Sequence, residues 1–349
     1  MPRLSVCCPM LVVILLSLGC AQELSRPTAL ATPSGAHDLS SWTSVTVGVA
    51  DMETALELWV NHFGLEVEQR RMGPDPDLAA LWNLQPDDIQ AQVLLRTPDQ
   101  IMGKLHLVQF SRPQAPVRRG AEVFDLVPKN LDVYVEDLPK RFEMLKASGY
   151  QFRNDIYSEI TAPSGTTFRE IHLLGHDDVN IVLLEVVGDS HEYSARGFSG
   201  IGPLIIIVAD APREKRFYRE GFGMEKLSDN ILEGPEIERM VGLPPGAALD
   251  VSIWGAASQP LGKMEVIDYR GVESTNLYPK ARAPALGILH ITYQTDQLKT
   301  LEQKLMTLDY PANIRDPLQT LIGSGQVLTT YSPAGLRIDV FDKAASGSH

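Results

Sequence analysis

An internal repeat constrains what this chain can fold into more than any other feature of its sequence. The segment VTVGVADMETALELWVNHFGLEVE begins at Val45 and resembles LIIIVADAPREKRFYREGFGMEKL, which begins at Leu204, 159 positions further on. GKLHLVQF and GKMEVIDY are separated by the same 159 positions, and so are Asp137 and Asp296. Because chance rarely produces several matches at one offset, the sequence predicts a duplication in which both halves adopt one fold.

Each half of the repeat is itself double. A unit begins with a strand that ends near an Asp, continues with a helix and a glycine turn, and finishes with three further strands. In the first unit the helix METALELWVNHF places Ala55, Leu56, Trp59 and Phe63 on one stripe, as a helix lying on a sheet requires. The later strands are expected over residues 65–71, 90–96 and 104–110, where KLHLVQF alternates like a strand with one covered face. The four units start near the following residues: Trp42, Phe124, Gly202 and Gly287.

This α+β pattern of four tandem β-α-β-β-β units, with its opening VADxxxAxxxxxxxFGxE, resembles the vicinal oxygen chelate superfamily. That superfamily includes glyoxalase I, extradiol dioxygenases, fosfomycin-resistance proteins and bleomycin-binding proteins. The resemblance covers residues 42–343 and implies two eight-stranded, cup-shaped half-barrels with helices on the outside. We therefore expect an N-terminal glyoxalase-like domain over residues 42–188 and a C-terminal one over residues 199–343, each of two units, with GFSGIG as the hinge.

The resemblance also implies a divalent metal inside a cup, held by the first and fourth strands of each unit. Carried over to the second half, these positions are Glu265, His290 and Asp339, while the remaining position, Pro203 or Leu204, has no side chain that binds metal. Oxygen ligands with one imidazole suit Fe, Mn, Zn or Ni, and open positions would admit two neighbouring oxygens of a substrate. Glu265 would then be either a ligand or the catalytic general base.

The corresponding positions in the first half are not expected to hold a metal. They are Ser44, His106, Asn130 and Val182, a set without a carboxylate. A divalent ion needs several charged or imidazole ligands to leave water. The first half is therefore interpreted as a structural or substrate-shaping partner.

Other candidates have ordinary structural explanations. His172 and His176 stand four apart and would share a face of a strand, but a solvated turn explains them as well. Trp254 and Tyr269 flank Glu265 in sequence and would either line a pocket or pack in the core.

Two classes of function remain open. The first is a metal-dependent lyase, isomerase or dioxygenase acting on a small substrate with neighbouring oxygens. The second is a non-catalytic protein that binds a small molecule, as bleomycin-binding relatives do. The convergence of Glu265, His290 and Asp339 would favour the enzyme, whereas the empty fourth position favours the binding protein. The sequence contains no indication of oligomeric state.

The N-terminus is typical of an export signal over residues 1–21. Arg3 is followed by an apolar run over residues 4–18 and by the small-residue sequence Gly19–Cys20–Ala21. Cleavage is expected either after Ala21 or before Cys20, which would then carry a lipid. Residues 22–41 have no apolar periodicity and predict a flexible tether. The mature protein is thus expected in the periplasm or as a membrane-anchored lipoprotein.

The net charge and the positions of the cysteines limit the classes of binding partner that are expected. The net charge of −13 disfavours nucleic acid, because such a surface repels phosphates. All three cysteines, Cys7, Cys8 and Cys20, precede the repeat, so the body has neither a disulfide nor a thiolate site. A small molecule is the expected partner, and the only expected membrane contact is the lipid on Cys20.

Overall fold

The computed structural model describes residues 39–161, 165–189 and 192–343. The predicted export signal and all but the last three residues of the predicted tether lie outside the described residues. No helix within the described ranges has the length and apolar character needed to cross a membrane.

The four predicted units are present in chain order. Unit 1 contains β1 (Ser44–Val49), α1 (Met52–Leu56) with a π-helical extension η1 (Glu57–His62), β2 (Glu66–Met72), α2 (Pro76–Trp82), η2 (Pro86–Asp88), β3 (Ile89–Arg96) and β4 (Lys104–Phe110), and is followed by β5 (Gln114–Pro116). Unit 2 contains β6 (Pro128–Val135), α3 (Leu138–Ala147), β7 (Gln151–Phe152), β8 (Ser158–Thr161), β9 (Thr167–Leu174), η3 (His176–Asp178) and β10 (Asn180–Val186).

The second half repeats the first. Unit 3 contains β11 (Phe198–Ile207), α4 (Ala211–Arg216) with its own π-helical extension η4 (Phe217–Phe222), β12 (Glu225–Glu233), α5 (Pro235–Val241), β13 (Ala248–Gly255) and β14 (Lys263–Arg270), and is followed by η5 (Tyr278–Lys280). Unit 4 contains β15 (Ala285–Thr295), α6 (Leu298–Thr307), β16 (Ala312–Gln319), β17 (Ser324–Tyr331) and β18 (Arg337–Asp342).

The repeated Asp residues mark the corner between the first strand and the helix of each unit. The carboxylates of Asp51, Asp137 and Asp210 accept hydrogen bonds from backbone N–H groups three residues on, and so cap α1, α3 and α4. Asp296 lies at the same corner, but Gln297 separates it from α6 and is the capping position. The duplication inferred from the offset is therefore visible in how each helix begins.

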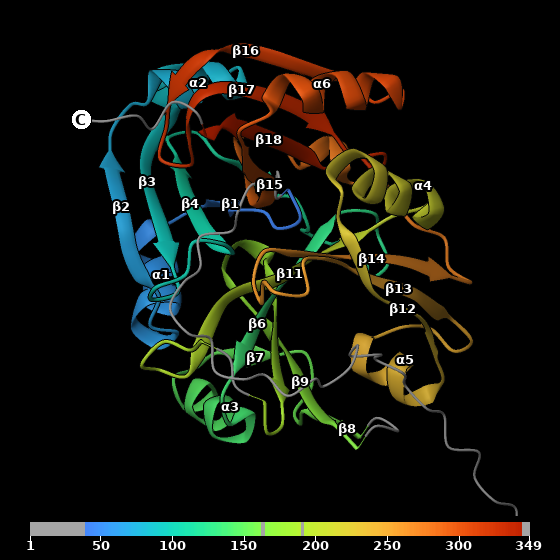
Figure 1. Cartoon of the computed structure of the whole chain (residues 1–349). Coiled ribbons are helices and arrows are strands. Elements are labelled where there is room, and N and C mark those ends of the chain that lie inside the picture. Colours follow the sequence, from blue (N-terminus) through green and yellow to red (C-terminus); the bar gives the residue numbers. More distant parts are fainter. Residues whose placement is uncertain (1–38, 162–164, 190–191, 344–349) are drawn as a thin grey trace, which may run out of the picture.

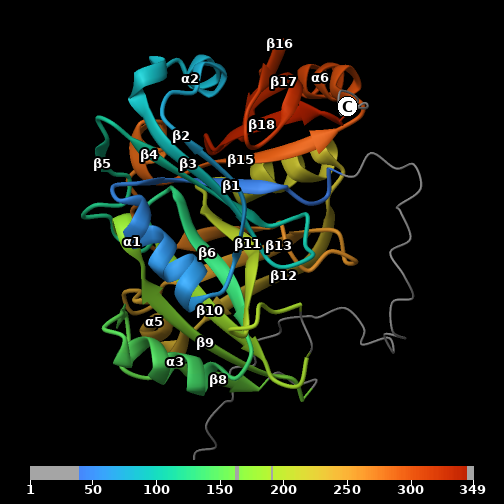
Figure 2. The same cartoon turned by 90° about the vertical axis from the view of Figure 1, so that its left-hand side faces the viewer.

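Unit 1 pairs with unit 4 and unit 2 with unit 3, whereas the sequence predicted that unit 1 pairs with unit 2 and unit 3 with unit 4. β1 pairs antiparallel with β15, so units 1 and 4 form one nine-stranded sheet, in which β5 also pairs with β15. β6 pairs antiparallel with β11, so units 2 and 3 form the other nine-stranded sheet. Figure 1 shows the blue and red ends of the chain together in the upper sheet and the green and yellow middle units in the lower one. Figure 2 shows the same division from the side.

The prediction that each sequence half closes into its own cup is therefore wrong, although the α+β architecture of two open, cup-shaped sheets is confirmed. The offset of 159 relates unit 1 to unit 3 and unit 2 to unit 4, and either pairing satisfies it. We call the concave face of the sheet of units 1 and 4 the first cup, and that of the sheet of units 2 and 3 the second cup.

The apolar residues divide into cores that match the two faces of the sheets. The largest core draws on β1, β6, β11 and β15 together with α1, α3, α4 and α6, so it lies on the convex faces and joins the two sheets. A second core fills the first cup, and a third lies in the second cup beneath α5. Units 1 and 3 each insert a short helix after their second strand, and α2 and α5 thereby cover the two cups.

Candidate functional site

The central strands of the first cup bring two histidines together. Thr46 lies opposite His106 on β4 and opposite His290 on β15. Its Oγ1 atom is 3.0 Å from His106 Nδ1 and 3.2 Å from His290 Nε2. Burial lowers the pKa of His106 to about 3 and that of His290 to about 4, so both rings are neutral.

Asp339 also lies in the first cup, where an arginine holds it. Arg337 Nε donates to both oxygens of Asp339, at 3.2 and 3.0 Å, and Thr329 Oγ1 donates at 2.7 Å. His290 Nε2 is 3.7 Å from Asp339 Oδ2. Burial alone would raise the pKa of Asp339, but the charge of Arg337 holds it below its usual value. The carboxylate is thus already neutralised by a buried guanidinium.

The first cup is also closed by α2. The ring of Trp82 contacts the rings of His290 and His106, with centroids 5.1 and 6.3 Å apart. Arg337 Nη2 donates to the carbonyl of Leu81 at 2.9 Å, which fixes the end of this helix in the cup. A hollow of about 210 Å³ remains beside Trp82, and its lining includes the charged side chains of Arg282 and Arg337 and the neutral ring of His290. Two guanidinium groups make this hollow unsuitable for a cation.

The three predicted metal ligands do not come together. His290 and Asp339 are neighbours in the first cup, but Glu265 is on β14 in the other sheet. The predicted convergence assumed that units 3 and 4 share a cup, and they do not. In the described part of the chain, no group of three or more His, Cys, Asp or Glu side chains is arranged to hold a metal ion.

The second cup repeats the register of the first with different residues. Ile205 on β11 lies opposite Asn130 on β6 and Glu265 on β14, as Thr46 lies opposite His290 and His106 in the first cup. Val182 takes the place that Asp339 has in the first cup. The positions that the family uses for metal thus hold one carboxylate, one amide and two apolar side chains. This donor set does not fit a divalent ion, and neither does the arginine-clamped set of the first cup.

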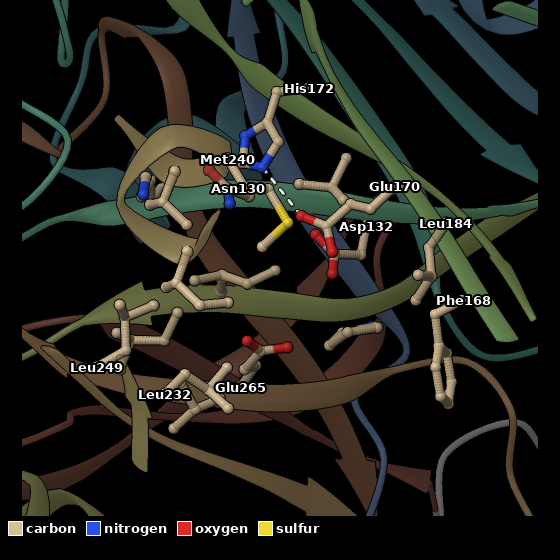
Figure 3. Close-up of a pocket in the computed structure, with 18 of the residues that line it drawn as sticks. Asn130, Asp132, Phe168, Glu170, His172, Leu184, Leu232, Met240, Leu249 and Glu265 are labelled. Carbon is tan, nitrogen blue, oxygen red and sulfur yellow. Dashed lines mark hydrogen bonds and ion pairs between the residues drawn. The ribbon is translucent and has the colours of Figure 1, made fainter. Parts of the chain in front are cut away.

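The second cup holds a cavity whose lining differs from that of the hollow in the first cup. Its volume is about 140 Å³, and it is bounded by the sheet and by Ile237, Met240 and Val241 of α5. Figure 3 shows the polar groups that turn toward this space from β6, β9 and β14. The ionisable and phenolic groups in the lining are Lys129, Asp132, Tyr134, Glu170, His172, Glu265 and Tyr269.

Glu265 and Asp132 lack hydrogen-bond donors in this cavity. Oδ1 of Asp132 is fully buried without a partner, and no described residue donates to the carboxylate of Glu265. Burial, and then the nearby charge of Glu170, raise the pKa of Glu265 to about 8, against a smaller opposing effect of Lys129. Burial together with Glu265 and Glu170 raises the pKa of Asp132 well above its usual value. Glu265 therefore holds a proton near neutral pH.

A strand irregularity brings a lysine into the same cavity. Ile205 and Ile206 are adjacent on β11, but their partners on β6 are Asn130 and Pro128, so Lys129 is an extra, bulged residue. Its Nζ donates to Tyr269 Oη at 2.6 Å. Burial, with the charges of Arg118 and Arg153, holds the pKa of Lys129 well below its usual value. Leu289 occupies the corresponding bulge on β15, which is one reason that the first cup is apolar.

A chain of hydrogen bonds fixes the remaining polar groups. Asn180 Nδ2 donates to Asn130 Oδ1 at 2.7 Å and lies 3.0 Å from His172 Nδ1. His172 Nε2 lies 3.0 Å from Glu170 Oε1. Burial lowers the pKa of His172, and a neutral ring protonated on Nε2 satisfies both contacts.

The structure shows which of the other candidate residues lie at the cavity. His172 lines the cavity, whereas His176 lies in the turn η3, where it contacts Trp59 and Asp177, so the two histidines do not share a site. Tyr269 lines the cavity, and Trp254 is buried in the core.

Sequence reasoning identified Glu265 but missed Lys129, Asp132 and Glu170. Asn130, Asp132 and Tyr134 alternate with the apolar residues of β6, and this polar face on a strand expected to be covered was the available signal. Glu170 offered no such signal, because a second charged residue, Arg169, precedes it on the same strand and the alternation is broken.

Comparison with known proteins supports the fold. No family model matches the sequence, and no curated protein is significantly similar to it. Glyoxalase I from Zea mays superposes with a TM-score of 0.58 at 13% identity, over 86% of this chain and 92% of that protein. A Bacillus subtilis protein described as a candidate dioxygenase superposes with a TM-score of 0.54 at 11% identity, over 88% of this chain and 87% of that protein. The chain therefore has the fold of the vicinal oxygen chelate superfamily, as the sequence resemblance implied.

Proposed function

We propose that this protein binds a small molecule in the second cup. The observation that carries the proposal is the contrast between two cups of one fold. The hollow in the first cup lies beside Trp82 and is lined by two arginines, one of them paired with Asp339. The cavity in the second cup is lined by carboxylates, and among the described residues Asp132 and Glu265 have no hydrogen-bond donor. Buried polar groups without partners are costly, so their retention around a cavity indicates a ligand that satisfies them.

An enzyme that moves a proton is the second candidate. Glu265 has a pKa of about 8 inside the cavity, so it changes protonation near neutral pH. Such a carboxyl group would accept or donate a proton in a lyase or isomerase reaction. A metal-dependent version of this hypothesis has no ligand set, because Glu265 and His290 lie in different cups.

Two substitutions on the edge strand β12 test the binding proposal. Leu232 lines the cavity, and a tryptophan there would fill it, whereas Ile231 is 48% exposed and is absent from the lining. The experiment screens small amines, alcohols and carboxylates by thermal shift with three proteins: wild type, Leu232→Trp and Ile231→Trp. Ligands should raise the Tm of wild type and Ile231→Trp but not that of Leu232→Trp. Equal shifts in all three proteins would place binding elsewhere and refute the proposal.

We also propose that the protein is exported. The proposal rests on the basic start, apolar run and small-residue end of residues 1–21, which lie outside the described residues.

A further inference from the structure

Three carboxylates converge on the cavity from three strands. Asp132 comes from β6, Glu170 from β9 and Glu265 from β14, and Figure 3 shows all three turned toward the same space. Asp132 is 7% exposed, and its Oδ1 atom is aimed into the cavity without a partner. Such an acceptor needs a donor, and within the described part of the chain none reaches it.

The cations near this cavity do not neutralise the carboxylates. Lys129 donates to Tyr269, and in the described residues it forms no ion pair with Asp132, Glu170 or Glu265. Arg118 and Arg153 act on Lys129 and Tyr269 but do not line the cavity. Glu170 has a donor in His172, which is neutral. Among the described residues, Asp132 and Glu265 therefore have neither an ion-pair partner nor a hydrogen-bond donor.

The cavity also has an apolar part. Side chains of α5, β12 and β13 form it: Leu232, Ile237, Met240, Leu249 and Val251. An apolar cavity of about 150 Å³ is known to accept benzene, so this one accommodates a body of roughly six non-hydrogen atoms. The lining thus combines carboxylates with apolar side chains, and a ligand that satisfies both is amphipathic.

We propose that the second cup binds small amphipathic cations, with an ammonium group at Asp132, Glu170 and Glu265 and an aliphatic body against α5 and β13. This inference rests on the proposed binding function and names its ligand class. An ammonium group supplies three N–H donors, which Asp132 and Glu265 lack among the described residues, and one positive charge to pair with the carboxylates. An anionic or purely apolar ligand would leave these acceptors unsatisfied.

The proposal has a consequence for protons. Glu265 holds a proton near neutral pH, and a bound cation favours its ionised form. Binding of an ammonium ion should therefore release protons to the buffer, whereas an alcohol should release none. Calorimetry of binding in two buffers with different ionisation enthalpies would measure the number of protons released for each ligand bound.

The test uses the full chain and three probes of one shape: 3-methylbutylammonium, 3-methylbutan-1-ol and 3-methylbutanoate. We expect the ammonium ion to bind about tenfold or more tightly than the alcohol, because its hydrogen bonds to carboxylates are charge-assisted. Glu265→Gln keeps the shape and should weaken ammonium binding about tenfold while leaving the alcohol within about twofold. Glu233→Gln, an exposed change on β12, is the matched control and should change neither.

The outcomes separate this inference from the proposed function. If the alcohol or the carboxylate binds wild type as tightly as the ammonium ion, or if Glu265→Gln leaves ammonium binding unchanged, the inference is overturned and the binding function stands. If none of the three probes binds, the inference is overturned, and the binding function is then decided by the wider screen with Leu232→Trp. Circular dichroism of each variant confirms that a loss of binding is not a loss of fold.

Discussion

Lys129 Nζ and Tyr269 Oη, 2.6 Å apart, join β6 of unit 2 to β14 of unit 3 across the second cup. Both side chains are buried, and the ring of Tyr269 also lies under the ammonium group, with the centroid 5.0 Å from Nζ. Removing the phenolic oxygen would leave a buried lysine without its acceptor.

We therefore expect Tyr269→Phe to lower the free energy of unfolding by about 1–3 kcal/mol, measured by urea denaturation. Adding Lys129→Met should recover most of this loss, since no polar group is then stranded. Simple additivity of the two changes would show that the bond does not couple these residues.

Stability should depend on pH through Glu265. Its pKa in the folded protein, about 8, is above the ordinary value of 4.5, so the folded state binds more protons between these values and stability falls as pH rises. The groups that face it are Asp132, Glu170 and Lys129. Glu265→Gln should be no more stable than wild type near pH 4 and increasingly more stable up to pH 8. Urea unfolding at pH 4, 6 and 8 checks this, and a constant difference would contradict it.

Removing one partner of the Arg337–Asp339 ion pair should destabilise the protein strongly, whereas replacing both partners with apolar residues should destabilise it much less. Asp339→Ala would leave Arg337 charged and buried, and we expect a loss of about 3–5 kcal/mol in the free energy of unfolding. The double variant Arg337→Met/Asp339→Leu should be much closer to wild type, because neither charge remains. A double variant as unstable as Asp339→Ala would show that the cup depends on the pair itself.

Metal content provides an independent check on the site. Because neither cup presents a fitting set of ligands, we expect purified protein to contain far less than one equivalent of Fe, Mn, Zn or Ni by elemental mass spectrometry. Glu265→Gln and His290→Ala should not change this content. One equivalent of metal in wild type that disappears in either variant would restore the metal hypothesis.

The mass of the mature protein shows which residue is first after processing. Cleavage after Ala21 would leave Gln22 as the first residue, whereas lipoprotein processing would leave a lipidated Cys20. We expect one of these two masses when the full chain is expressed in a bacterium with a periplasm. Recovery of intact Met1 in the cytoplasm would argue against export.

The sequence was sufficient to predict the units but not their partners. Repeated spacing, the corner Asp residues and the apolar stripe of METALELWVNHF are local signals, and local signals determine helices and strands. Whether β1 pairs with β15 or with β6 depends on contacts between strands far apart in the chain. The prediction of a Glu265, His290 and Asp339 site failed for that reason, although two of its members are neighbours.

The cavity was harder to predict than the fold. Lys129 enters it through a bulge, and one extra residue reverses the face on which a strand side chain lies. The closure of the first cup depends on α2, which an inspection of β-strand positions does not consider. Neither a bulge nor an inserted helix can be inferred from the alternation of apolar and polar residues along a strand.

The crossed pairing of the units makes the two halves of the chain mutually dependent. A single cut between residues 187 and 198 would yield two fragments, each carrying one half of both sheets. Neither fragment could complete a sheet alone, because β1 would lose β15 and β6 would lose β11. Each would expose unpaired strand edges, which favour association with another chain. The halves are therefore suited to fragment complementation, and a shorter ancestor of two units could have formed both sheets only as a dimer.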